Sequence, residues 1–337
     1  TSNLGRSICA TLEYTDGGAR LRKYFGQPKT PGTLTDGHWA RYLTANKKAV
    51  CTIGSTTSGY TIADCDYLCD GTADQTEIQA AINSSQEYGE IVFLPGTYVL
   101  SQGITVNKPH LTLRGTGSVT LQYTAASGTA LELGVSKNFC VLDNLNITKQ
   151  TQSTVTGTGI DMRADYCTVK NCTISQFERG INIGNTGQLT ITHNVIHDCK
   201  NGIYVDVAWQ SNFSYNYLHT LSSYGIYVNG TYSSLQIVGN RIITTPSPLY
   251  LWGVQDTVIS NNHLSAKWGI TLTMPNGVNV VINANIMQVS GTGTGSVGAL
   301  DINGSGHIIT NNILYGNSMV NTDGSSMVYT NNLEINT

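Results

Sequence analysis

Residues 189–196 read Leu-Thr-Ile-Thr-His-Asn-Val-Ile, and the same frame, apolar-x-apolar-x-x-Asn-x-apolar, returns along the second half of the chain. Its asparagines are separated by 22, 24, 22, 23 and 27 residues and are Asn194, Asn216, Asn240, Asn262, Asn285 and Asn312. A period in the twenties indicates a solenoid, in which each repeat forms one coil that packs against its neighbours. Residues one period apart then lie about 4.8 Å from one another, the spacing of paired strands.

The residue pattern between the asparagines indicates which type of solenoid the chain forms. Each period holds short segments in which apolar and polar residues alternate, as in strands, and no stripe with the period of a helix. A leucine-rich repeat would require Leu-x-x-Leu-x-Leu followed by a helical return, which is absent. The sequence therefore predicts an all-β fold, a parallel β-helix with one coil for about every 22–24 residues.

Each repeated asparagine is expected at a sharp turn with its side chain inside the coil. There the amide can bond to the asparagines of the coils above and below, which satisfies a buried polar group. Asparagine also tolerates the left-handed backbone that such a turn requires. The pattern therefore predicts a ladder of amides through the interior, in which Cys172 replaces the asparagine of its coil.

An apolar-x-apolar triplet precedes each asparagine frame and defines a second strand. The two apolar residues of a triplet are expected to point inward and the middle residue outward. The nine triplets are residues 104–106, 131–133, 160–162, 181–183, 203–205, 226–228, 249–251, 270–272 and 300–302. One outer face of the β-helix can therefore be predicted directly from the sequence.

The charge of the 337 residues is low and uneven. Only 12% are charged, against about 25% in average soluble proteins, and the net charge is −3. Residues 1–50 hold eight Lys or Arg and three acids, so they carry +5 and the remainder carries −8. This asymmetry predicts a separate docking or oligomerisation segment over residues 1–63, followed by the β-helix over 64–337.

Several classes of partner and site are not expected. The chain lacks a concentrated basic stripe, which argues against nucleic acid, and an 18-residue apolar run, which argues against membrane insertion. The eight cysteines are interpreted mainly as small stacked hydrophobic residues. Cys65 and Cys69 have no second pair at the spacing of a zinc site, so we predict no metal and no cofactor.

A short helix is predicted where the β-helix begins. Asp74 and Glu77 match the Asp-x-x-Glu capping box, and Ile78, Ala81 and Ile82 share one face of a helix over about residues 74–84. The first coil of a solenoid exposes an apolar end that must be covered. We therefore predict that this helix caps the N-terminal end of the stack.

The region after residue 70 carries a resemblance to a known superfamily. Residues 70–82 read Asp-Gly-Thr-Ala-Asp-Gln-Thr-Glu-Ile-Gln-Ala-Ala-Ile, and residues 95–98 read Pro-Gly-Thr-Tyr. These motifs resemble the start of pectin-lyase-like right-handed β-helix proteins, particularly phage tailspikes and related surface glycan-processing proteins. The resemblance covers residues 64–335 and implies a right-handed, single-stranded parallel β-helix outside the cell, on its surface or on a virion. It leaves function open, because function depends on the site and not on the fold.

The predicted outer face combines aromatic and acidic side chains. The middle residues of the triplets are Thr105, Glu132, Asp161, Asn182, Tyr204, Tyr227, Tyr250, Thr271 and Asp301. A second outward column, two residues further on, contains Arg163, Asp206, Asn229 and Trp252. The three successive tyrosines would form an aromatic strip about 10–15 Å long.

Flat rings beside carboxylates are what a sugar chain requires. We therefore predict that a polysaccharide or cell-surface glycan is bound by Arg163, Asn182, Tyr204, Tyr227, Asn229, Tyr250 and Trp252. Aromatic ladders also stabilise sheets without binding a ligand, and this alternative stays open.

Three acids on this face are candidates for catalysis. Glu132 and Asp161 lie on neighbouring coils, where carboxyl groups about 5 Å apart would match a retaining glycosidase. Asp161 and Asp206 lie two coils apart, near the roughly 6.5–9.5 Å of inverting enzymes. We predict Asp161, Glu132 and Asp206 as the catalytic residues, with Asp161 central and Arg163 facing Asp206 across Gly184.

The sequence leaves three functions open. The first is hydrolysis of a polysaccharide, the second is a non-catalytic spike that binds a glycan or receptor, and the third is a structural surface protein. A lyase is less favoured, because holding a uronate requires cations and this face has few Lys or Arg residues. A homotrimer is a candidate assembly, and the identity of the sugar is not determined.

Overall fold

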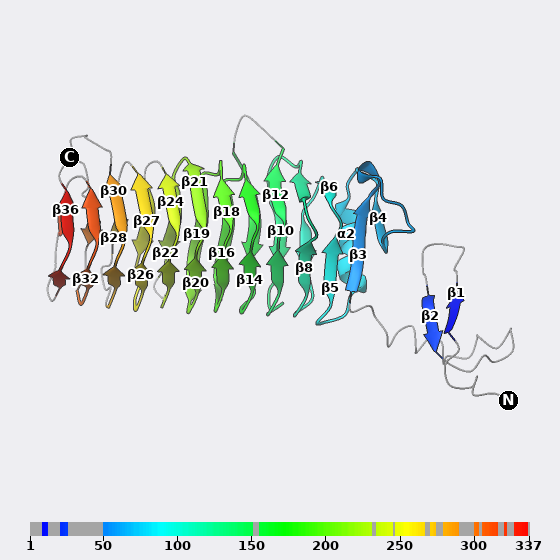
Figure 1. Ribbon diagram of the computed structural model, residues 1–337, viewed down its shortest axis with the longest axis horizontal. Helices are drawn as coiled ribbons and strands as arrows, with labels where there is room; N and C mark the ends of the chain where they lie inside the picture. The colour runs from blue at the N-terminus through cyan, green and yellow to red at the C-terminus, as the bar shows by residue number, and fades with distance from the viewer. Residues whose placement is uncertain are drawn as a thin grey trace.

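The computed structural model describes residues 9–12, 21–25 and 50–335, apart from gaps at 151–154, 231–233, 245–246, 267–269, 274–278, 290–299, 303–304, 316–319 and 322–326. Figure 1 shows a row of stacked coils that runs from the blue and cyan N-terminal strands to the red C-terminal ones. Three long parallel sheets run along this stack, so the predicted parallel β-helix is confirmed. The strands β1 (Cys9–Leu12) and β2 (Leu21–Phe25) form a separate antiparallel pair.

The ten-stranded sheet contains the predicted triplets. Its strands are β7 (Ile104–Val106), β10 (Thr129–Leu133), β13 (Thr158–Met162), β16 (Arg179–Gly187), β19 (Asn201–Trp209), β22 (Tyr224–Asn229), β25 (Ser247–Trp252), β28 (Ile270–Thr273), β31 (Leu300–Ile302) and β34 (Val320–Asn321). The apolar residues of the seven triplets from Ile104 to Leu251, and Leu300, are almost completely buried, as alternation along a strand predicts.

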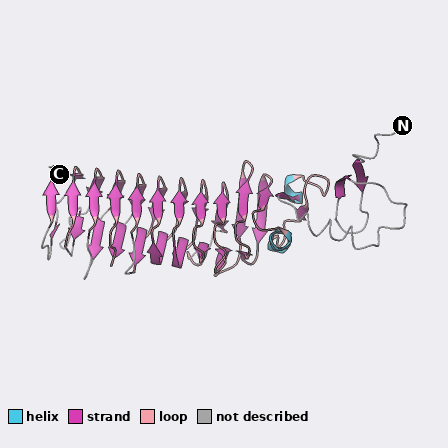
Figure 2. Cartoon of the chain, turned by 90° about the horizontal axis from the view of Figure 1, so that it is seen from below, coloured by secondary structure: helices cyan, strands magenta, loops and turns pink. Residues whose placement is uncertain are grey.

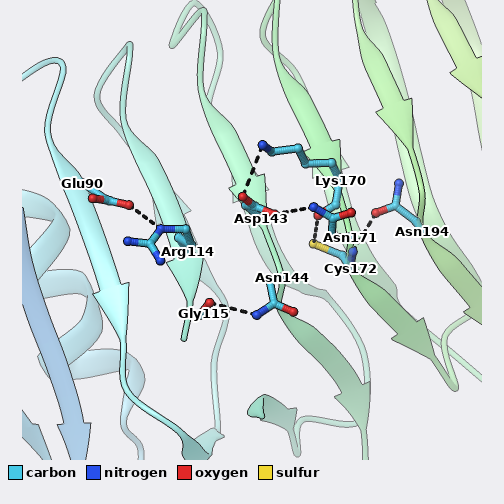
Figure 3. Close-up of polar contacts among 9 residues, drawn as sticks. All are labelled: Glu90, Arg114, Gly115, Asp143, Asn144, Lys170, Asn171, Cys172 and Asn194. Carbon is cyan, nitrogen blue, oxygen red and sulfur yellow. Dashed lines mark hydrogen bonds and ion pairs between the residues drawn. The ribbon is translucent and has the colours of Figure 1, made fainter. Parts of the chain in front are cut away.

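The thirteen-stranded sheet lies before the asparagine turn of each coil. Its strands are β4 (Tyr67–Cys69), β3 (Val50–Ser55), β5 (Glu90–Phe93), β8 (Thr112–Gly115), β11 (Val141–Asp143), β14 (Thr168–Lys170), β17 (Thr190–Thr192), β20 (Asn212–Ser214), β23 (Gln236–Val238), β26 (Val258–Ser260), β29 (Val281–Asn283), β32 (Ile308–Thr310) and β35 (Val328–Thr330). Ion pairs join neighbouring coils on its outer side, between Arg114 and Glu90 at 2.6 Å and between Lys170 and Asp143 at 3.3 Å (Figure 3).

The eleven-stranded sheet follows the asparagine turn. Its strands are β6 (Gly96–Leu100), β9 (Val119–Tyr123), β12 (Asn146–Lys149), β15 (Thr173–Ser175), β18 (Val195–His197), β21 (Tyr217–Leu221), β24 (Arg241–Thr244), β27 (His263–Ala266), β30 (Ile286–Val289), β33 (Ile313–Tyr315) and β36 (Leu333–Ile335). Figure 2 shows the same stack from below, with strands as its dominant element. From β5 to β34, each coil thus contributes one strand to each of the three sheets, and the enclosed side chains form a single long core.

The asparagine ladder is confirmed. From Asn194 to Asn332 each side-chain amide donates to the amide oxygen of the next asparagine at 2.9–3.0 Å. The same oxygen also accepts the backbone N–H of the preceding asparagine, so the buried amides are satisfied from both sides. Cys172 begins this ladder in place of an asparagine, and its backbone N–H donates to the amide oxygen of Asn194 (Figure 3).

The backbone of this turn differs from the prediction. The left-handed conformation belongs to the residue before each ladder asparagine, as in His193, Tyr215 and Asn261, which have φ of 56°, 56° and 57°. The ladder asparagine must instead point into the core, where Asn194 is 1% exposed. The strain of the turn is therefore carried by a residue whose side chain lies outside the core.

The predicted helix is confirmed as α2 (Gln75–Ser84), but its predicted capping box is wrong. The two carboxylate oxygens of Asp74 accept the backbone N–H groups of Gly71 and Val99, at 2.8 and 2.7 Å, and make no capping bond within the helix. Asp74 therefore ties the helix start to strand β6. The helix buries Ile78, Ala81 and Ile82 completely against β3, β4, β6 and β7, while its role as a cap stays a prediction.

Strand β3 falls within the predicted N-terminal segment. Strand β3 pairs with β4 and β5, and its Cys51 and Ile53 belong to the core. A short 3₁₀ helix, Thr56–Ser58, follows β3. Strand β3 therefore lies in the thirteen-stranded sheet, although the charge asymmetry predicted a separate segment over residues 1–63. Most of residues 1–49 lie outside the described residues, so the docking or oligomerisation segment stays a prediction. Within the described residues, no helix is long and apolar enough to cross a membrane.

Candidate functional site

The predicted outward residues form one straight column on the ten-stranded sheet. Register pairs Glu132 with Asp161, Asp161 with Asn182, and Asn182 with Tyr204, and it continues to the next two tyrosines. Glu132, Asp161, Asn182, Tyr204, Tyr227 and Tyr250 together form the outer column. The structure therefore brings together, on successive coils, all the residues that the triplet pattern placed side by side.

Asp161 lies beneath other side chains of this face and is only 3% exposed, which corrects the expectation that it faces solvent. One carboxylate oxygen accepts Nε of Arg163 at 2.8 Å, and a terminal guanidinium nitrogen of Arg163 lies 2.8 Å from the same oxygen. The other oxygen accepts the amide of Asn182 at 2.8 Å. Arg163 therefore pairs with Asp161 on its own coil. The prediction that Arg163 faces Asp206 is wrong.

The charges at this point stabilise one another. The hydrogen bond and charge of Asp161, and to a lesser extent the charge of Glu132, raise the pKa of Arg163. Half of the Arg163 side chain is exposed, so its remaining N–H groups are open to a ligand. Asp161, in contrast, has both oxygens occupied, so any ligand would have to displace Arg163 or Asn182 to reach it.

Arg179 links this polar network to the tyrosines and was missed in the sequence. It donates to the Asn182 amide oxygen at 2.7 Å, and its guanidinium carbon lies 3.7 Å from the ring centroid of Tyr204. Such a contact is a cation–π interaction. The triplet pattern could have indicated Arg179. This residue stands three positions before the middle residue of its triplet, and the residues at that position on neighbouring coils pair in register to form a third column.

The tyrosines of the outer column form a stacked ladder. The ring centroids of Tyr204 and Tyr227 lie 4.9 Å apart with planes at 15°, and those of Tyr227 and Tyr250 lie 5.1 Å apart with planes at 7°. Tyr224, from the third column, packs against both Tyr227 and Tyr250 at 5.1 and 5.3 Å. Burial, followed by the charges of its neighbours, raises the pKa of Tyr227.

This geometry corrects the idea that flat tyrosine faces are available to a sugar. Each ring of the ladder is stacked against the next ring, and the free face of Tyr204 is covered by Arg179. The ladder therefore presents ring edges and phenolic hydroxyl groups at intervals of about one coil. Hydroxyl groups can donate to and accept from the hydroxyl groups of a sugar.

The second predicted column is more open to solvent. Asp206 and Asn229 are exposed, and Trp252, which is paired in register with Asn229, is 36% exposed. Asp206 is close enough to the ladder to contribute to the raised pKa of Tyr227. The column thus adds an indole, an amide and a carboxylate beside the tyrosine ladder.

Glu132 lies in an open pocket of about 440 Å³ at the N-terminal end of this face. The pocket is lined by Ser101, Gln102, Gly103, Ile104, Thr105, Tyr123, Ala125, Ser127, Thr129 and Glu132. Glu132 is the one carboxylate among these lining residues. Of the neutral lining residues, Thr105 belongs to the predicted outward column. The loop residues of the lining, such as Gln102 and Ser127, were not predicted, because the strand pattern does not place loops.

Lys149 holds the loop that borders this pocket. It is 2% exposed, and its ammonium group donates to the backbone oxygens of Ala126 and Thr156 at 2.7 and 3.0 Å. Burial lowers the pKa of this amine. The side chain therefore acts as an internal tie between the pocket loop and the start of the next coil.

One cysteine and two acids gather near helix α2 and could in principle hold a metal ion. Ligand atoms of Cys69, Asp74 and Glu77 lie within 4.8 Å of one another. The oxygens of Asp74 are already bound to backbone N–H groups, and burial, followed by the charges of Asp74 and Glu77, raises the pKa of Cys69. A thiol held protonated is a poor metal ligand, so this cluster does not fit a metal.

Comparisons with known proteins agree with the architecture. A family model for the right-handed β-helix region matches residues 111–262. DFA-IIIase from Arthrobacter chlorophenolicus A6, solved in complex with DFA-III, is similar with a TM-score of 0.67 and 16% identity, over 84% of this chain and 83% of that one. The complex of the same enzyme with GF2 has a TM-score of 0.59 and 17% identity, over 84% and 91%.

A surface adhesin has the same fold. PfbA of Streptococcus pneumoniae is similar with a TM-score of 0.57 and 13% identity, over 81% of this chain and 91% of that one. A search of curated proteins finds no match to the sequence. At these identities the similarity establishes the fold alone, so the chain has a right-handed parallel β-helix fold.

Proposed function

We propose that this chain binds a polysaccharide along the outer column, outside the cell or on a cell or virion surface. The observation that carries the proposal is the unbroken sequence of polar and aromatic groups on one straight face. Guanidinium groups, an amide and three phenols follow one another in contact there, from Arg163 to Tyr250. These planar polar groups and hydroxyl groups supply directional hydrogen bonds to sugar hydroxyls.

The comparisons support this choice of ligand class. One neighbour of the same fold was solved with DFA-III and with GF2, and another is a surface adhesin. A long face with hydroxyl groups repeated coil by coil suits an extended ligand whose own hydroxyl groups also repeat. Binding would therefore depend on several weak contacts along the column and not on one deep pocket.

A glycan array probed with the full chain tests the proposal. Tyr227→Phe removes one hydroxyl group and keeps the stacked ring, so the affinity for a bound glycan is expected to fall about three- to tenfold, the value of one hydrogen bond. Tyr215→Phe is the matched control, because Tyr215 is 58% exposed in a turn away from this sheet. Equal losses from both variants, or no binding to any glycan, would contradict the proposal.

Hydrolysis of the bound glycan is the second candidate function, and the placement of Glu132 favours it. Glu132 lies in the open pocket, one coil from the buried carboxylate of Asp161. One carboxyl group that reaches solvent beside one held by Arg163 is an arrangement in which an acid and an anion can play separate parts in glycoside cleavage. Asp206 is the alternative partner, two coils further along the face.

Release of new reducing ends from a glycan that binds tests this second function. Glu132→Gln should lower turnover by a factor of roughly 10²–10⁴ and leave binding intact. Asp161→Asn should lower turnover as well, and its melting temperature must be measured in parallel because it also loses the ion pair with Arg163. If the wild-type chain binds the glycan and releases no reducing ends, the protein is a non-catalytic binder.

A further inference from the structure

A second stack of rings lies in the turns that lead into the thirteen-stranded sheet. Tyr88, His110, Phe139 and Tyr166 form this edge stack, and each stands two residues before its strand, β5, β8, β11 or β14. The ring centroids of successive members lie 4.1, 4.7 and 4.6 Å apart, with planes at 17°, 3° and 14°. Each ring therefore covers one face of the next, on four successive coils.

The backbone at this turn position does not favour aromatic residues. It is left-handed at all four members of the edge stack, with φ of 62°, 57°, 63° and 58°. A positive φ is an outlier for a bulky residue. On the later coils the same position holds polar residues, which are Gln188, Gln210, Ser234, Asp256 and Asn279. Four aromatic rings in succession therefore point to a role beyond the turn itself.

The rings of the edge stack remain open to solvent. Phe139 and Tyr166 are 46% and 43% exposed, and Tyr88 is 72% exposed although His110 covers one of its faces. A ring with one covered face can keep such an exposure only when its other face is open. The tyrosine ladder differs, because Arg179 covers the end ring of Tyr204. The edge stack thus ends in the kind of free ring face that the ladder does not offer there.

The edge stack lies on the coils that begin the proposed binding face. Its last three rings follow outward residues of the ten-stranded sheet by five, seven and five positions along the chain, and these residues are Thr105, Glu132 and Asp161. Two of them, Thr105 and Glu132, line the open pocket. The stack therefore continues the polar face across the edge between the two sheets.

We propose, on the basis of the proposed glycan-binding function, that the open face of Tyr88 is a stacking platform for one sugar ring of the polysaccharide. The face of an aromatic ring is negative, so it attracts the C–H groups on the apolar side of a sugar. The carboxylate of Glu87, the exposed residue before Tyr88, can accept hydroxyl groups of the same sugar. A stable protein partner would bury about 800 Å² on each side, whereas this stack is one residue wide.

Substitution of Tyr88 tests the inference with the oligosaccharide that gives the strongest signal on the glycan array. Tyr88→Ala should lower its affinity about five- to tenfold, and Tyr88→Phe, which keeps the ring, should retain most of it. Tyr215→Ala is the matched control, because Tyr215 is 58% exposed, has φ of 56° and stacks on His193 at 5.3 Å in another turn. Equal affinities of Tyr88→Ala and the wild-type chain, or equal losses in Tyr88→Ala and Tyr215→Ala, would overturn the inference.

Further measurements separate this inference from the proposed function and from a structural role. If Tyr227→Phe weakens binding and Tyr88→Ala does not, the outer column binds the glycan and only the platform is wrong. If the wild-type chain binds no glycan, both proposals fail. Melting temperatures show whether a loss of affinity in Tyr88→Ala reflects unfolding, and a loss that Tyr88→Phe fails to restore would contradict ring stacking. A changed oligomeric state of Tyr88→Ala with unchanged affinity would assign the ring to a protein contact instead.

Discussion

Two ladders run along this molecule, one of asparagines inside the coils and one of tyrosines outside them. Both place one residue on each coil, and both join neighbours, through amide hydrogen bonds at about 3 Å in one and ring contacts at about 5 Å in the other. The inner amides are 0–2% exposed from Asn194 to Asn312, whereas the tyrosines stay partly exposed. A buried amide without its partner would cost free energy, while an exposed phenol can exchange its partner for water.

This difference separates stability from function. The inner ladder repeats with little variation because every coil must satisfy the same buried groups. The outer column changes from carboxylate to amide to phenol over six coils, because the fold sets few conditions on an outward side chain. The outward residues can therefore vary to give a binding specificity without disturbing the fold.

The largest effect is expected from breaking the inner ladder. Asn240→Ala removes the acceptor of two groups of Asn216 and the donor to Phe213 and Asn262. The expected loss is about 3–6 kcal/mol, since each buried group left without a partner costs about 1–3 kcal/mol. Chemical denaturation measures it, and a loss below about 1 kcal/mol would show that water replaces the amide.

A cavity in the core should have a comparable but smaller effect. Ile237 is completely buried on β23, and Ile237→Ala should lower the free energy of unfolding by about 2–5 kcal/mol. Ile237→Val removes a single methylene group and should cost about 0.5–1.5 kcal/mol. Thermal melts that rank Val below Ala in stability would contradict the assignment of this position to the interior.

His307 differs from the ladder asparagines, because it is a buried polar residue that does not belong to a hydrogen-bonded ladder. It is completely buried, and neither ring nitrogen has a hydrogen-bond partner among the described residues. Burial lowers its pKa below the usual 6.5, so the unfolded chain binds the proton first as the pH falls. Its contribution to stability is therefore complete above about pH 6.5 and is lost as the pH decreases from there.

His307→Leu should accordingly flatten this part of the pH profile. Between pH 7 and pH 5 the wild-type chain should lose stability with a slope of at most about 1.4 kcal/mol per pH unit from this group. Denaturation at both pH values compares the variant with His193→Leu, in which an exposed turn histidine is replaced. An unchanged slope in His307→Leu would mean that another group causes the loss.

The outer ladder should give the smallest change in stability. Tyr227→Ala removes ring contacts with Tyr204, Tyr250 and Tyr224, each worth at most about 0.5–1 kcal/mol on an exposed surface. The total loss should therefore not exceed about 1.5–3 kcal/mol and should stay below that of Ile237→Ala. Equal losses for the two variants would remove the distinction between the inner and outer ladders.

The sequence by itself determined the coil, its period and the side of the strand on which each residue lies. A period of two along strands and of about 23 along the chain fixes these features, because alternation and stacking require only local geometry. The register of Glu132, Asp161, Asn182 and Tyr204 followed from the same arithmetic and is confirmed.

Only the tertiary structure decided what the outward residues touch. Whether Arg163 contacts Asp161 or Asp206, and whether Arg179 covers the ring of Tyr204, depends on long side chains that have many rotamers and several candidate partners. The pocket around Glu132 depends on loops from separate coils. The carboxylate of Asp74 accepts hydrogen bonds from Gly71 in the adjacent turn and from Val99 in the distant strand β6. Such contacts join residues that no periodicity relates, so the strand pattern could place them on a face but could not pair them.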